Sequence, residues 1–135
     1  MLVPLLVVDE LDGLKRHSET KTRARGALKM LDEVFTRVSQ SNTMGVLRQA
    51  DGTLGLGPIT MELLFDPPDH ERLPDNDAEI VDRALAVKAL AGRPVTMVTY
   101  DKNMAFRARY AGLQAVSPPY PEPEEGQARS RRGPQ

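Results

Sequence analysis

The sequence predicts a single α/β domain in which a parallel β-sheet is covered by helices on both of its faces. Three short apolar runs, at residues 2–8, 95–99 and 113–116, have the length and the Val and Leu content of buried strands. Stretches with helical periodicity separate these runs. Buried strands that alternate with amphipathic helices are typical of a parallel sheet, and 135 residues suit one domain.

The first strand is predicted at residues 2–8, with Pro4 favouring an early or irregular position in it. Residues 10–16 predict a helical turn or two, and residues 22–38 predict a long helix. The apolar residues of that helix recur every three or four positions and form one stripe: Ala24, Ala27, Leu28, Leu31, Phe35 and Val38.

The middle of the chain predicts a β-hairpin, because Asp51 and Gly52 lie between two short apolar segments. Residues 59–65 predict a further strand. Helices are predicted at 77–91 and at 103–111, and each is followed by a glycine, which commonly ends a helix.

The composition is that of an ordinary globular domain, with 40% hydrophobic and 27% charged residues and a net charge of −1. The absence of cysteine excludes disulfides and thiolate metal sites, and it agrees with a cytoplasmic location. No apolar run approaches the roughly 20 residues that cross a membrane. Residues 117–135 contain five prolines and almost no large apolar side chains, so we expect a disordered tail rich in Pro, Arg and Glu.

Three acidic residues stand out, because each follows an apolar run or a loop and opens a helix-like stretch: Glu10, Asp77 and Asp101. The carboxyl ends of parallel strands share one crevice, so we expect these side chains to converge there. Converging carboxylates suit Mg²⁺ or Mn²⁺, which prefer oxygen ligands. Helix capping is the alternative role for Asp77 and Asp101, although Asp75 or Asn76 could also cap the second helix.

Four segments carry a family resemblance: V-P-L-L-V-V-D-E-L-D-G-L-K, T-R-A-R-G-A-L-K-M-L-D, N-D-A-E-I-V-D-R-A-L and V-T-M-V-T-Y-D-K-N. In this order and spacing they resemble the PIN-domain nucleases, especially the PhoH-associated branch. The resemblance implies a three-layer α/β/α PIN-like domain at residues 1–116 with a β-hairpin insertion.

The resemblance also implies an activity and the residues that carry it. PIN domains cleave RNA phosphodiesters with water activated by one or two Mg²⁺ or Mn²⁺ ions. By similarity, Glu10, Asp77 and Asp101 are the catalytic metal ligands, and Thr99 and Asn103 support them. Arg25 matches an arginine of the PhoH-associated pattern, and Arg107 stands where relatives often have lysine.

Arg25 and Arg107 are candidates for binding RNA phosphates, and the alternative for each is a solvated helix face. A base-stacking surface is not expected, because the chain has three Phe, three Tyr and no Trp. No glycine-rich phosphate loop, serine nucleophile motif or zinc-ligand spacing is present. RNA is the expected substrate, and a homodimer, an antitoxin or a PhoH-like ATPase domain are the expected partners.

The family pattern begins with a strand that carries another Asp, in a D-T-N or D-T-S setting, and no such strand precedes Met1. The resemblance therefore implies an N-terminally truncated domain that is an active ribonuclease in its full-length form. A partner chain that fills the gap and a decayed remnant remain alternatives. The second functional reading is a catalytically impaired PIN-like module that binds RNA or regulates a partner.

Overall fold

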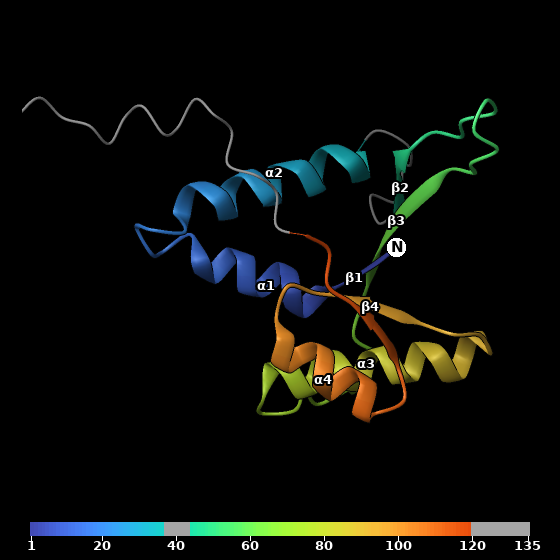
Figure 1. The fold of residues 1–135 in the computed structure, drawn as a ribbon. Helices are drawn as coiled ribbons and strands as arrows, with labels where there is room; N and C mark the ends of the chain where they lie inside the picture. The colour runs from blue at the N-terminus through green and yellow to red at the C-terminus, as the bar shows by residue number, and fades with distance from the viewer. Residues whose placement is uncertain (37–43, 120–135) are drawn as a thin grey trace, which may run out of the picture. The chain divides into compact units, whose positions relative to one another are not determined.

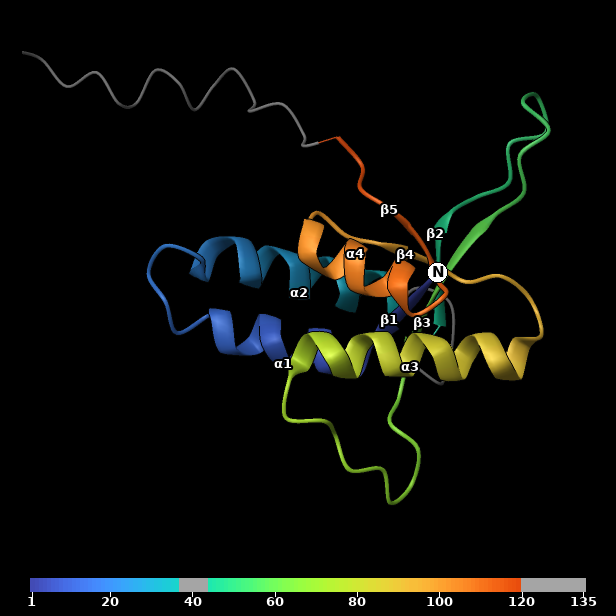
Figure 2. The ribbon, with the colours of Figure 1, turned by 60° about the horizontal axis from the view of Figure 1, so that its bottom comes forward.

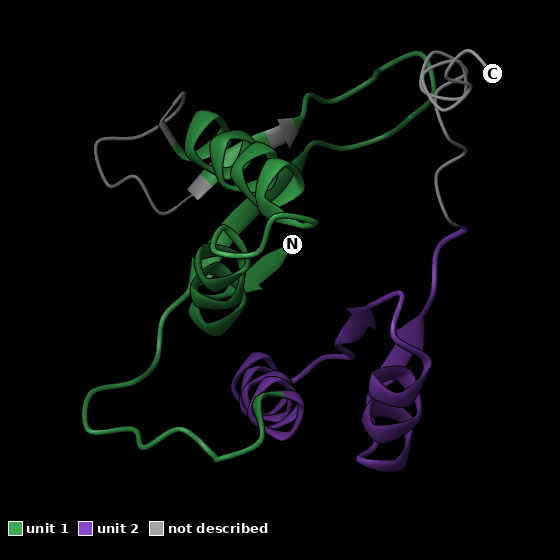
Figure 3. Cartoon of the chain, turned by 90° about the vertical axis from the view of Figure 1, so that its left-hand side faces the viewer, with its two compact units in different colours: residues 1–76 green, residues 77–135 purple. Residues whose placement is uncertain are grey.

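The computed structural model describes residues 1–36 and 44–119, and these form four helices and five strands (Figure 1). The chain divides into two compact units, residues 1–76 and residues 77–135 (Figure 3). Most of the predicted tail, residues 120–135, lies outside the described residues, so its disorder stays a prediction. None of the described helices has the length and apolar character that a bilayer span requires.

The first unit contains β1 (Leu2–Pro4), α1 (Leu5–Leu14), α2 (Lys21–Thr36), β2 (Met44–Arg48) and β3 (Ile59–Leu64). Its sheet has the order β1-β3-β2, with β1 parallel and β2 antiparallel to β3. The helices α1 and α2 lie side by side (Figures 1 and 2). Of the apolar stripe predicted on the long helix, Leu31 and Phe35 belong to a core that also contains Val34 and Met61, and Ala24 is buried. Val38 lies outside the described residues.

The strand predicted at residues 2–8 is wrong beyond Pro4, where α1 begins. Pro4 is extended and occupies the N-cap position of α1. Proline cannot donate to a strand ladder but is tolerated at the start of a helix. Leu6 is buried, and Val8 and Leu11 pack against the core as residues of one helix face. A short apolar run does not distinguish a buried strand from a buried helix by periodicity alone.

The predicted hairpin is present, but its strands are β2 and β3. The apolar segment at 54–56 contributes one isolated bridge, between Asp51 and Leu56, within the projecting tip (Figure 2). The Asp51 carboxylate accepts hydrogen bonds from the Thr53 backbone N–H at 3.0 Å and from its hydroxyl at 2.6 Å. These bonds lower the pKa of Asp51, with the hydroxyl as the larger cause.

The second unit is built from α3 (Asn76–Ala91), β4 (Thr96–Val98), α4 (Lys102–Tyr110) and β5 (Gln114–Val116). The strands β4 and β5 are parallel, and α4 connects them. The core of this unit consists of Val81, Met97, Met104, Ala108 and Leu113. Gly92 and Gly112 follow the two helices with φ of 62° and 93°, a left-handed conformation that glycine adopts without strain.

The predicted α/β class and the parallel strand pairing are therefore confirmed. Each unit contributes one parallel pair. The three-layer arrangement concerns the stacking of the whole domain and stays a prediction.

Candidate functional site

Asp101 lies between β4 and α4, at the position that the sequence predicts. Its Oδ1 accepts hydrogen bonds from the backbone N–H groups of Asn103 at 2.8 Å and Met104 at 3.1 Å. The capping role is thus confirmed. Over residues 1–36 and 44–119, no hydrogen bond reaches the other oxygen, Oδ2, and the side chain is exposed. The cap fixes the carboxylate while one oxygen still faces solvent.

Thr99 and Asn103 both contact Asp101, Thr99 through its side-chain hydroxyl and Asn103 through its backbone N–H. The Thr99 hydroxyl accepts a hydrogen bond from the Asp101 backbone N–H at 3.0 Å. Asn103 contributes its backbone N–H, so the hydrogen bond to the Asp101 carboxylate does not depend on the Asn103 side chain. Both residues therefore orient Asp101, and the role expected for them beside a metal site stays a prediction.

Asp77 lies in the first turn of α3, where a carboxylate interacts favourably with the helix dipole. Its side chain is half-buried. Asp77 and Asp101 therefore belong to one unit, and each stands at the start of a helix.

Glu10 lies in the second turn of α1, and the strand end predicted just before it does not exist. Its carboxylate is exposed, and Oε1 accepts a hydrogen bond from the Asn76 side-chain amide at 3.0 Å. Asn76, which immediately precedes Asp77, thus forms a hydrogen bond with Glu10. Glu10 belongs to the first unit and Asp77 and Asp101 to the second, so the convergence of the three acids stays a prediction.

Arg72 forms a second polar link within the first unit, beside Glu10. Its guanidinium pairs with Asp9 at 2.8 Å and with Asp66 at 2.7 Å. Two hydrogen bonds raise the pKa of Arg72: the one to Asp9 has the larger effect and the one to Asp66 the smaller. Asp9 is therefore a partner of Arg72. Arg72 and Asn76 lie 63 and 66 residues from their α1 partners, so no local sequence signal could have identified them.

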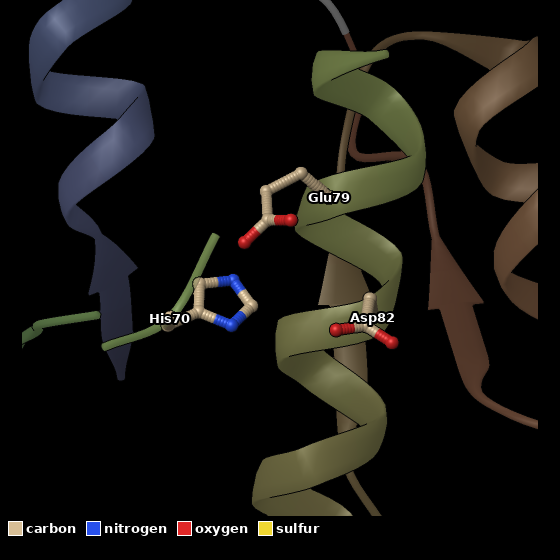
Figure 4. A group of neighbouring side chains, drawn as sticks. All are labelled: His70, Glu79 and Asp82. Atoms are coloured by element: carbon tan, nitrogen blue, oxygen red, sulfur yellow. The ribbon is translucent and has the colours of Figure 1, made fainter. Parts of the chain in front are cut away.

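Two carboxylates on α3 form a pair that the sequence analysis did not single out. Glu79 and Asp82 offer carboxylate oxygens within 4.8 Å of each other (Figure 4). Glu79 is fully buried and Asp82 is exposed. His70, the third residue labelled in Figure 4, belongs to the first unit and is not counted in this pair. The i, i+3 spacing of the two acids is the signal that could have revealed them.

The two candidate RNA-binding arginines lie on different helices. Arg25 is exposed on α2 in the first unit, and Arg107 is exposed on α4 in the second. Both can therefore meet a solvent-borne ligand. A shared RNA path between them stays a prediction.

Comparison with known proteins identifies the family. The sequence profile of the PIN domain matches residues 1–118. Protein PhoH2 of Thermobispora bispora is 34% identical over 119 residues, which cover 85% of this chain and 26% of that protein. Protein PhoH2 of Mycolicibacterium smegmatis is 34% identical over 122 residues, with the same shares covered.

This chain thus spans about a quarter of the length of the curated relatives it matches. No solved structure matches it. PIN domains are generally metal-dependent nucleases. The profile match over nearly the whole described chain shows that this protein belongs to the PIN domain family.

Proposed function

We propose that this chain is the nuclease domain of a metal-dependent endoribonuclease, with Glu10, Asp77 and Asp101 as ligands of Mg²⁺ or Mn²⁺. The observation that carries the proposal is the geometry of Asp101. Backbone N–H groups hold its Oδ1, and Oδ2 takes no hydrogen bond from the residues that the structure describes. A carboxylate fixed in this way presents an oxygen to a cation without first losing side-chain freedom.

The donor set fits a hard cation. The proposed ligands are all carboxylates, and the chain has no cysteine that would favour zinc. When bound, the metal supplies a water of lowered pKa and positive charge for the phosphodiester transition state. Thr99 and the Asn103 backbone hold Asp101 in place, and Asn76 holds Glu10. Exposed Arg25 and Arg107 are proposed to bind RNA phosphates.

Cleavage assays on the full chain test this function. Glu10→Gln keeps an oxygen that accepts from Asn76, and Asp101→Asn keeps the helix cap, so both remove the charge without removing the local hydrogen bond. With labelled single-stranded RNA and Mn²⁺, each variant is expected to lose roughly a hundredfold or more in cleavage rate, because several kcal/mol of transition-state stabilisation depends on the metal.

Asp12→Asn is the matched control for the cleavage assay, because Asp12 is an exposed acid of α1 that pairs with Lys15 at 2.6 Å. It is expected to cleave like the parent chain. Unchanged cleavage in both Glu10→Gln and Asp101→Asn would contradict the proposed site. RNA binding without any cleavage by the parent chain would instead support the alternative, a PIN-like module that binds RNA or regulates a partner.

The partner proposal rests on the relatives alone. Both curated relatives are named PhoH2, and this chain matches 26% of each. We therefore propose a PhoH-like protein or domain as its partner. A homodimer, an antitoxin and a cytoplasmic location stay predictions from the sequence.

A further inference from the structure

Two aromatic side chains project from the solvent-facing side of α4. Phe106 is 65% exposed and Tyr110 is 96% exposed. They are four residues apart, so they are neighbours on one helix face, and their Cβ atoms are about 6 Å apart. The opposite face of α4 carries Met104, Ala105 and Ala108, which are buried. The orientation of the helix is thus set by its apolar face, and it leaves both rings in water.

Cations flank the two rings. Lys102 precedes Phe106 by one helical turn, and Arg107 and Arg109 follow it, all exposed. The Arg109 guanidinium donates to the Ala115 carbonyl at 2.9 Å, which holds it beside the helix without neutralising its charge. No acidic residue occurs from Lys102 to Pro119. The α4 surface therefore combines two flat apolar rings with three positive charges.

These features point to a ligand with flat rings and regularly spaced negative charges. Aromatic side chains stack on nucleic-acid bases regardless of sequence, and cations beside them bind the phosphates. A second protein copy would match the rings but would also bring the like charges of Lys102 and Arg109 against one another. We propose that the α4 surface, made of Lys102, Phe106, Arg107, Arg109 and Tyr110, binds single-stranded RNA by stacking bases on its two aromatic rings.

The position of this surface relates it to the proposed nuclease site. Asp101 caps the start of α4, and Phe106 and Tyr110 lie about 7.5 Å and 13.5 Å further along the helix axis. Bases stacked there would belong to nucleotides near the phosphodiester that is cleaved at the metal proposed to bind Asp101. This part of the inference rests on the proposed function, whereas RNA binding by the surface does not.

The low aromatic content of the sequence predicts no stacking surface, and the surface proposed on α4 would be an exception to that expectation. The chain has three Phe and three Tyr residues, and two of these six, Phe106 and Tyr110, lie on adjacent turns of one helix. A small number of aromatic residues is enough when the fold places them together.

Binding assays on the full chain in the presence of EDTA test the surface without any cleavage. Phe106→Leu and Tyr110→Leu keep apolar side chains and remove the rings. Each is expected to weaken binding of a labelled single-stranded RNA roughly five- to 150-fold, the range typical of one stacked base. Leu90→Ala is the control, because Leu90 is 89% exposed on α3, and this variant is expected to bind like the parent.

Two further variants separate stacking from charge. Lys102→Gln is expected to lower the slope of log Kd against log salt by about 0.7, the value for one phosphate contact on a single strand. The chain has no tryptophan, so Phe106→Trp introduces a single reporter whose fluorescence is expected to be quenched when RNA stacks on it.

Several outcomes would overturn this surface: no binding of single-stranded RNA by the parent, unchanged binding in both Leu variants, or an effect of these variants on self-association alone, seen by sedimentation. The two proposals fail separately. Loss of binding in the Leu variants without any nuclease activity would refute the nuclease and keep the surface. Normal RNA binding by the Leu variants, together with metal-dependent cleavage by the parent, would refute the surface and keep the nuclease.

Discussion

Asp101 combines a structural role with the ligand role proposed for it. Its Oδ1 accepts from two backbone N–H groups at the start of α4, and its backbone N–H is held by Thr99. Capping and metal binding use different oxygens of the same carboxylate. From the sequence these roles are alternatives, whereas the geometry makes them compatible.

Substitutions at Asp101 should therefore separate stability from activity. Asp101→Ala removes the cap and is expected to lower the free energy of unfolding by about 1 kcal/mol. Asp101→Asn retains a capping oxygen and is expected to keep most of that stability while losing cleavage. Urea denaturation followed by circular dichroism measures the difference. Equal destabilisation by Ala and Asn would show that the charge, and not the cap, stabilises α4.

Gly45 shows how one element depends on another. A Cβ atom at this position would clash with the Val34 carbonyl oxygen of α2, so β2 approaches the helix backbone too closely for any side chain. Gly26 in the middle of α2 has nothing within 4 Å of its would-be Cβ. The first unit thus has one glycine with no room for a side chain, Gly45, and one with open space around it, Gly26.

The two alanine substitutions are expected to have opposite effects on thermal stability. Gly45→Ala should cost on the order of 1–3 kcal/mol, because β2 must shift away from α2. Gly26→Ala should stabilise the protein by up to about 1 kcal/mol, since alanine favours the helix. Thermal melts compare both with the parent. A neutral Gly45→Ala would mean that β2 does not pack on the α2 backbone.

At the scale of the whole molecule, the proposed ligands are divided between the two units. Glu10 comes from α1 of the first unit, and Asp77 and Asp101 come from the second. A metal bound by the proposed ligands would stabilise the folded chain by mass action.

A thermal-shift titration with Mn²⁺ tests each proposed ligand. At a concentration about 100 times the Kd, Mn²⁺ should stabilise the parent by about 2.7 kcal/mol, seen as a higher Tm. Glu10→Gln and Asp101→Asn should each reduce the shift, because each removes a ligand from a different unit. A shift that Asp101→Asn abolishes and Glu10→Gln leaves intact would confine the site to the second unit. Asp12→Asn again provides the control.

The sequence alone determined the elements whose signals are local. Helical periodicity predicted α2 and α3 within two residues at each end, and glycine predicted where α3 and α4 end. The order of short motifs was sufficient to identify the PIN family, which the profile match confirms. These features depend on neighbours a few residues away, so a single sequence contains them.

Tertiary structure decided the features that depend on what covers a segment. Residues 5–8 belong to α1, whose Val8 and Leu11 pack against a core that contains Leu31 of α2, and periodicity in a short run cannot reveal this contact. The bond between Asn76 and Glu10 joins residues 66 positions apart. Phe106 and Tyr110 form a surface because burial of the opposite face turns α4 that way. Burial and long-range pairing are properties of the folded chain, and they decide which side chains can meet a ligand.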